Sequence, residues 1–103
     1  MRDMLDNARR AVELLRTKTL VEFEGDNVLQ LAVTRLIEIV GEAATHVPPE
    51  VRAVYPEIPW REASSMRNWL IHAYHDVEVE RLWDTVATDL PPLVAELERA
   101  LAV

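Results

Sequence analysis

Apolar residues recur at helical spacing over nearly the whole chain, and this periodicity limits the fold to packed helices. The strongest example spans residues 27–46, where one apolar stripe includes Val28 and Leu31 and a second stripe includes Val33. A helix that is apolar on two faces lies either in the centre of a bundle or between a core and a subunit interface. Gly41 inside this helix costs about 1 kcal/mol relative to Ala, which indicates that another backbone approaches closely there.

Capping and turn signals divide the rest of the chain into further helices. Asp26 is a suitable N-cap, and the run Phe23-Glu24-Gly25-Asp26 separates its helix from a first one. Proline restricts the residue before it, so Pro48-Pro49 ends the second helix, and Pro59 suits the start of the third. We expect helices over about 2–18, 27–46, 60–74 and 78–88, and a last one that Asp89-Leu90-Pro91-Pro92 caps and opens.

These elements predict an all-α, up-and-down four-helix bundle made of one domain, residues 1–103. A short extra helical turn is expected at 50–55, and the last long helix is expected to be kinked or split. The absence of Cys removes disulfides, thiolate chemistry and Cys-ligated zinc. No apolar run approaches the roughly 18 residues of a membrane span, and the N-terminus does not resemble a signal peptide. A cytoplasmic protein without a membrane association is therefore expected.

The charge of the chain is unusual for a protein that handles nucleic acid. The net charge is −7, and an acidic surface repels a polyphosphate. Binding of RNA therefore requires a local cationic patch, while the acidic surface elsewhere suits a basic partner. Ten of the eleven basic residues are Arg, which grips phosphate with two parallel hydrogen bonds.

The segment 65–74 concentrates chemically useful side chains on the third predicted helix. On an ideal helix Asn68 lies about 40° from His72, and Ser65 lies about 20° from it, so the three form a polar stripe. Arg67 lies about 140° round from His72. A two-fold dimer brings Arg67, Asn68 and His72 of both chains into one cleft more easily than a single chain does.

These residue types suffice for cleavage of RNA without a metal. His72 is suited to accept the proton of the ribose 2′-OH, because an imidazole titrates near neutral pH. Arg67 is suited to stabilise charge on the phosphorane oxygens, and Asn68 to orient the phosphate or the imidazole. RNA is preferred to DNA as the substrate because the 2′-OH is itself the nucleophile.

Each of these residues also has a simpler interpretation. His72 alone is most often a hydrogen-bonded, half-buried histidine. Arg67 alone is usually a helix-surface ion pair, with Glu62 or Asn68 close enough to occupy it. Tyr74 alone is a packing residue at a helix end. A divalent ion held by His72, His75 and Asp76 is a further alternative, although it needs another ligand.

Several other side chains also have both a structural and a functional interpretation. His46 is expected at a helix end, interacting with the dipole. The three tryptophans are most simply core or interface residues, although Trp69 also suits stacking on a base. Glu42 is a surface ion pair or a support for an Arg or His across the bundle.

Four ordered segments resemble the HepT-like toxin subunits of the HEPN superfamily. They are 35–43 with its Gly-Glu-Ala, the proline-rich 55–61, the motif Arg-x4-His-x-Tyr within 65–74, and Leu82-Trp83-Asp84 with Asp89-Leu90-Pro91. The resemblance implies metal-free RNA cleavage by the catalytic pair Arg67 and His72, with Asn68 adjacent. It also implies a homodimer with a composite active site, and no cofactor or metal.

The resemblance further implies a partner, a MntA-like nucleotidyltransferase antitoxin that attaches AMP to Tyr74. A bulky anionic adduct two residues from His72 fills the cleft and opposes phosphate binding. Supporting roles are expected for Glu42, Ser65 and Trp69. Ser65 stands where Gly is common in the family, and Trp69 where a smaller aliphatic residue is usual, so both narrow the expected cleft. The alternative from another class is a non-catalytic helical subunit that binds a nucleotidyltransferase or a nucleotide.

Overall fold

The computed structural model describes residues 1–72 and 78–103, except for the side chains of Trp69, Ile71 and His72. Within these ranges the secondary structure is helical throughout, with no strand, which confirms the all-α prediction. The elements are α1 (Arg2–Leu15), α2 (Leu20–Glu24), α3 (Asn27–Thr45), α4 (Pro49–Val54), α5 (Trp60–His72), α6 (Val79–Asp84), the π-helical stretch η1 (Thr85–Asp89) and α7 (Leu90–Leu101).

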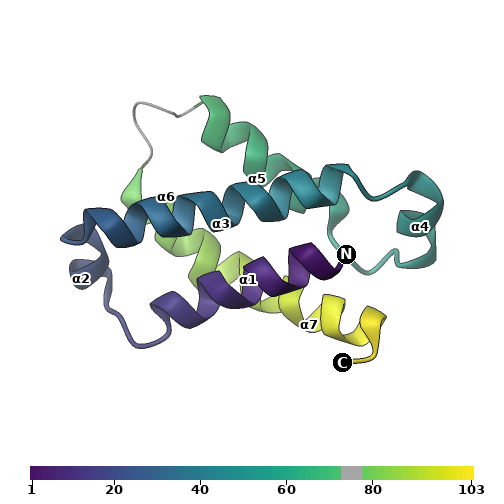
Figure 1. The fold of residues 1–103 in the computed structure, drawn as a ribbon, viewed down its shortest axis with the longest axis horizontal. Helices are drawn as coiled ribbons and strands as arrows, with labels where there is room; N and C mark the ends of the chain where they lie inside the picture. Colours follow the sequence, from purple (N-terminus) through teal and green to yellow (C-terminus); the bar gives the residue numbers. More distant parts are fainter. Residues whose placement is uncertain (73–77) are drawn as a thin grey trace.

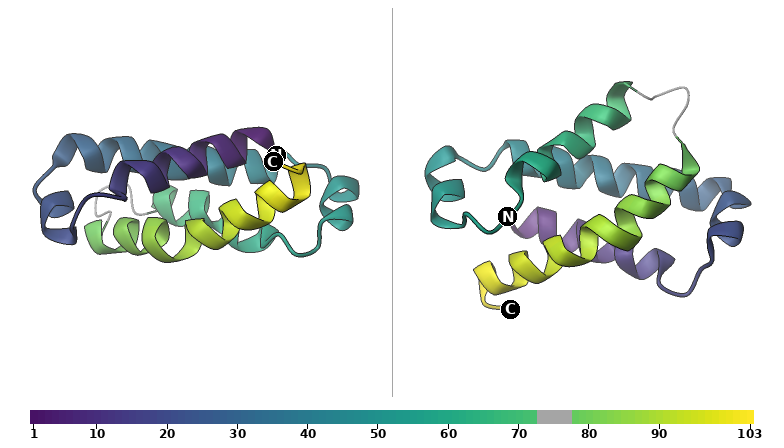
Figure 2. Two further views of the ribbon diagram at one scale, coloured as in Figure 1. Left: turned by 90° about the horizontal axis from the view of Figure 1, so that it is seen from below. Right: turned by 180° about the vertical axis from the view of Figure 1, so that it is seen from behind.

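The helix α3 has neighbours on two sides. The helix α1 packs along one side and α5 crosses the other, while α7 packs against α1 (Figure 1). Towards its C-terminal end α5 rises away from α3, which is also visible from behind in Figure 2. The extensive packing of α5 is against α3 alone. The second long helix thus packs between two other helices, and a subunit interface on its remaining apolar face stays a prediction.

The buried core joins apolar stripes from α1, α3, α5 and the C-terminal helices. Burial of such side chains is the main favourable contribution to folding. The second apolar stripe of α3 points into this core, whereas Val28 and Leu31 of the first stripe are 76% and 64% exposed. The largest fully buried side chains are Phe23, Met4, Leu5, Ile37, Leu82, Leu90, Leu93, Leu97, Val33 and Val40.

The segment after α1 differs from the prediction. The first helix ends at Leu15, and the run that was expected to be irregular contains α2. The signal for α2 is a capping box, in which Thr19 Oγ1 accepts from Glu22 N and Glu22 Oε1 accepts from Thr19 N. The hydrogen bond from the Thr19 backbone also lowers the pKa of the Glu22 carboxyl. Phe23 is buried here, with its ring centroid 5.8 Å from that of Trp83.

The C-terminal elements α6, η1 and α7 form one continuous helical run with a π-helical interruption. Leu90 donates its backbone N–H to the carbonyl of Thr85, which is the wide turn that defines a π helix. Pro91 and Pro92 cannot donate such bonds, and the wide turn before them accommodates this break. The expected kink is thus confirmed, whereas the expected cap is wrong. Asp89 makes no capping hydrogen bond, because the helix passes through it.

The other predicted elements agree closely with the structure. The Asp26 side chain caps α3 by accepting from Leu29 N at 3.0 Å. The helix α4 begins at Pro49, in the place of the expected short turn. Across residues 1–72 and 78–103, no helix has the length and hydropathy needed to span a bilayer.

Candidate functional site

The contact between α3 and α5 is built around Gly41. A Cβ placed on Gly41 would lie 2.7 Å from the backbone N of Arg67, 2.8 Å from its Cβ and 3.2 Å from the carbonyl O of Ala63. Real Cβ atoms essentially never approach other atoms as closely as the first two distances. The predicted close approach at Gly41 is therefore confirmed, and the backbone it admits is that of Arg67.

The start of α5 is tied to the connector before it. Trp60 Nε1 donates to the carbonyl O of Tyr55 at 3.0 Å, and Ala63 N donates to the carbonyl O of Pro59 at 2.9 Å. Ala63, Met66 and Leu70 are buried, so the apolar face of α5 lies inward as its periodicity predicts. These contacts fix the rotation of α5 and with it the direction of its polar residues.

The structure places two of the predicted site residues at the surface of α5 and one partly inside. Asn68 and Ser65 are exposed, and Ser65 Oγ donates to the carbonyl O of Glu62 at 2.8 Å. Arg67 is half-buried. Within the part of the chain that the structure describes, Arg67 forms no ion pair, so the predicted alternative of a pair with Glu62 is absent there.

The remaining residues of the motif extend beyond what the structure describes. His72 is the last residue of α5, and its side chain lies outside the described part, as does that of Trp69. Tyr74 lies outside the described residues altogether. The alternative metal site of His72, His75 and Asp76 falls there too. In the described ranges no group of three His, Cys, Asp or Glu residues is arranged to hold a metal.

The predicted supporting residue Glu42 lies on a different side of α3 from the α5 contact. Glu42 is exposed and borders a surface groove of about 870 Å³ together with Arg35 and His46. Arg35 pairs with Glu38. His46 is the C-terminal cap of α3, and its Nδ1 lies 2.9 Å from the carbonyl O of Glu42, which confirms the prediction of a helix-end histidine.

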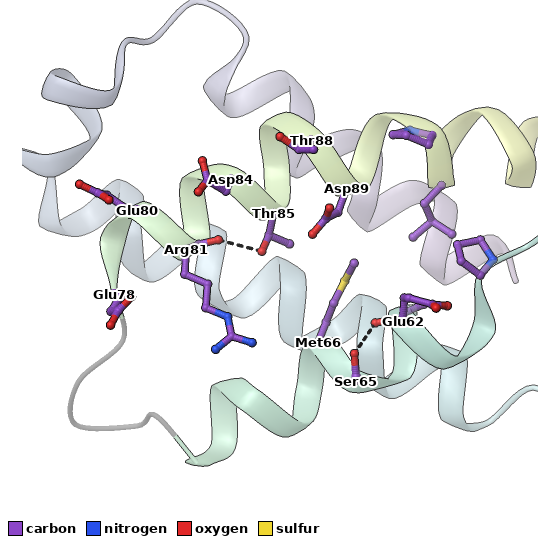
Figure 3. Close-up of a pocket in the computed structure, with 14 residues that line it drawn as sticks. Glu62, Ser65, Met66, Glu78, Glu80, Arg81, Asp84, Thr85, Thr88 and Asp89 are labelled. Atoms are coloured by element: carbon purple, nitrogen blue, oxygen red, sulfur yellow. Dashed lines mark hydrogen bonds between the residues drawn. The ribbon is translucent and has the colours of Figure 1, made fainter.

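A groove of about 670 Å³ separates α5 from the run α6–η1–α7 (Figure 3). We call it the acidic groove, because its lining includes the carboxylates of Glu62, Glu78, Glu80, Asp84 and Asp89. Its floor includes the buried Met66 and Leu93, and the Arg81 side chain extends between its walls. No local pattern in the sequence predicts this groove, since its walls come from 59–66 and 78–93.

The acidic groove constrains how RNA can approach α5. Several carboxylates lining one concave surface produce a negative potential, which is focused by the low-dielectric walls. A polyphosphate is therefore disfavoured on the side of α5 that carries Glu62. Asn68 is not among the residues that line this groove.

Comparison with known proteins shows the family to which the chain belongs. The family described as ribonuclease HepT-like matches residues 4–100, and the chain belongs to that family. No solved structure matches.

Curated relatives extend over nearly the same length. A protein of Thermococcus cleftensis named "Probable ribonuclease HepT" is 41% identical over 102 residues, covering 95% of this chain and 93% of its own. A "Putative RNase" of Methanocaldococcus jannaschii is 33% identical, covering 93% of this chain and 88% of its own. Another, from Caldanaerobacter subterraneus, is 32% identical, covering 95% and 88%.

Proposed function

We propose that this protein is a metal-independent endoribonuclease in which Arg67, Asn68 and His72 act on the RNA backbone. The observation that carries the proposal is the fixed position of Arg67 together with the lack of an ion pair to its side chain in the described part of the chain. Its backbone is locked against Gly41, yet its side chain makes no ion pair within the described ranges. The guanidinium of this half-buried residue is therefore positioned by α5 without a carboxylate of the described chain to neutralise it. A phosphate of RNA is an anion that suits it.

The chemistry requires no cofactor. His72 accepts the proton of the 2′-OH, and the 2′-oxygen forms a bond to the adjacent phosphorus. The bond from phosphorus to the 5′-oxygen then breaks, and that oxygen takes a proton from an imidazolium or from water. The products are a 2′,3′-cyclic phosphate and a 5′-hydroxyl. Arg67 stabilises the negative charge of the phosphorane, and Asn68 orients the phosphate.

A cheap assay tests whether a metal takes part. We expect the purified protein to cleave single-stranded RNA in excess EDTA at the rate seen without it. Loss of cleavage in EDTA, with recovery when Mg²⁺ is added, would assign the reaction to a metal site instead. The alternative of a non-catalytic subunit is favoured by the net charge of −7 and by the acidic groove. That alternative predicts no cleavage with or without EDTA.

The proposed active site is composite and belongs to a homodimer. Arg67 and His72 lie about 140° apart on an ideal helix, so two facing copies of α5 supply a complete set of groups more easily than one. The outer face of α3 offers a surface for the second copy. Val28 and Leu31 are strongly exposed on it, and Val21 of the adjacent α2 is 77% exposed.

The substitution Leu31→Glu tests this interface. A carboxylate in the centre of an apolar interface is left without a partner, so we expect the dimer dissociation constant to rise at least tenfold. Light scattering after size-exclusion chromatography measures the mass, and RNA cleavage is expected to fall with the dimer population. Val54→Glu is the matched control, because Val54 is 66% exposed on α4. A dimer of unchanged affinity in the Leu31 variant would remove this patch from the interface.

We also propose a nucleotidyltransferase partner that attaches AMP to Tyr74 and silences cleavage. The proposal is supported by the resemblance of the motif and by the position of Tyr74, two residues after the proposed base. An adenylate adds negative charge at the proposed phosphate-binding cleft and so opposes RNA binding. In this proposed toxin–antitoxin pair, the nuclease is the toxin and the transferase is the antitoxin.

Mass spectrometry tests this modification directly. We expect the intact protein, co-expressed with a candidate nucleotidyltransferase, to gain the mass of one or more adenylate groups and to lose activity on RNA. The Tyr74→Phe variant, which lacks the acceptor oxygen, should gain no mass and stay active. An equal gain in that variant would place the modification on another residue.

A further inference from the structure

Arg61 is an exposed cation whose position has no structural explanation. It is the second residue of α5, and in the described part of the chain it forms no ion pair. Five other arginines there are paired with carboxylates: Arg2, Arg9, Arg16, Arg35 and Arg99. Arg61 thus belongs to a minority whose charge is available to a ligand.

The local position of Arg61 is unfavourable for the helix. The first turn of a helix carries a partial positive charge, which favours acidic residues and disfavours basic ones. Glu62 in the same turn is of the favourable kind. Arg61 is of the opposite kind, and therefore helix stability does not account for it.

Arg61 shares a face with Asn68 and His72, two of the three proposed catalytic residues. On an ideal helix it lies within about 20° of both Asn68 and His72. Its Cα lies about 16 Å along the helix axis from that of His72, a distance that spans several nucleotides of an extended strand. Arg61 is also absent from the lining of the acidic groove, which borders this face of α5 at Ser65 and continues past Glu62 and Met66.

We propose that Arg61 binds a phosphate of the RNA substrate several nucleotides away from the cleaved bond. This inference rests on the proposed RNA cleavage and assigns the path of the strand, which follows the exposed polar face of α5 from His72 towards the start of the helix. The acidic groove borders this face at Ser65, and its carboxylates disfavour a strand that shifts towards Glu62. In the proposed dimer, each end of the cleft carries one Arg61.

Direct binding measures this contact without cleavage. In a His72→Ala background, the affinity for a fluorescent single-stranded oligoribonucleotide long enough to follow α5 is measured by anisotropy at several salt concentrations. We expect Arg61→Ala to raise the dissociation constant about fivefold, as for one exposed charge contact. The slope of log affinity against log salt should fall by roughly 0.7, the value for one phosphate contact to a single strand. Arg61→Lys, which keeps the charge, should retain most of the affinity.

Two further measurements separate a binding role from a structural one. In the active protein, Arg61→Ala should raise KM for the long RNA, and this penalty should shrink for a dinucleotide that cannot reach residue 61. Its melting temperature should be unchanged or higher, since a cation leaves the first turn of α5. The matched control is Arg10→Ala, which removes an exposed arginine of α1 that has no ion pair within the described ranges. It should bind and cleave RNA as the wild type does.

The outcomes are distinguishable. Wild-type affinity and salt slope in the Arg61→Ala variant would overturn the assignment, as would an equal loss in Arg10→Ala. A lower melting temperature that accounts for the whole loss would also overturn it. If His72→Ala and Arg67→Ala cleave RNA normally, the proposed function itself fails. If those two variants are inactive while Arg61→Ala binds normally, only the path of the strand is wrong.

Discussion

Replacing His72 with alanine is expected to lower the rate of RNA cleavage by about 10²- to 10⁴-fold, the usual contribution of a general base. Arg67→Ala is expected to lower it by about 10²- to 10³-fold, because one donor to the charge that develops in the transition state is lost. Cleavage of a defined oligoribonucleotide under single-turnover conditions measures both losses. His46→Ala is the matched control for the imidazole, since His46 caps α3 and borders a groove that no described residue of α5 lines.

Mixing the two inactive variants gives a sharper result than either alone. If the active site is composite, a heterodimer of Arg67→Ala and His72→Ala subunits contains one complete site, so cleavage should reappear after the subunits are exchanged. If each subunit uses its own Arg67 and His72, no activity returns. Full activity in either single variant would show that the residue has no catalytic role.

Gly41→Ala is expected to destabilise the protein by about 1–3 kcal/mol, as overpacking of a close contact does. This is the reverse of the usual effect, because Ala in a helix interior is favoured over Gly by about 1 kcal/mol. The added Cβ would meet the backbone N and the Cβ of Arg67, neither of which is the flexible end of a side chain. Either α5 moves outward or the contact stays strained.

Thermal unfolding followed by circular dichroism measures this destabilisation, with about 4–8 °C expected per kcal/mol for a domain of this size. Gly25→Ala is the control, because a Cβ there would meet carbonyl oxygens only at 3.7 and 3.8 Å. RNA cleavage should fall further in the Gly41 variant than the unfolded fraction explains, since Arg67 moves with α5. A Gly41→Ala protein as stable and active as the wild type would mean that α5 tolerates displacement from α3.

The long helices were predictable because each has an apolar stripe at helical spacing and a distinct capping or proline signal. The helix α2 was missed because its five residues are too short to display a period, although Thr19 and Glu22 form a capping box. The continuity of the run from α6 to α7 was missed for a different reason. Two prolines normally mark a helix start, and only tertiary packing decides that the helix continues through them.

The candidate site, like the fold, could be predicted only in part from the sequence. The position of Gly41 indicated a close contact, but the sequence did not say that its partner is Arg67. The acidic groove depends on how α5 is placed relative to α6–η1–α7, so no local sequence pattern predicts it. Glu42 is exposed and borders a groove with Arg35 and His46, so its expected support for an Arg or a His stays a prediction.

Because α5 packs extensively against a single neighbouring helix, the stability of the domain and its proposed activity depend on largely different residues. Most of the large buried side chains belong to α1, α3 and the C-terminal run, so residues on the outward face of α5 contribute little to the free energy of unfolding. Changes at such positions can therefore alter which RNA is recognised while the scaffold remains folded. A library randomised only on that face should yield mostly folded proteins with divergent substrate preferences.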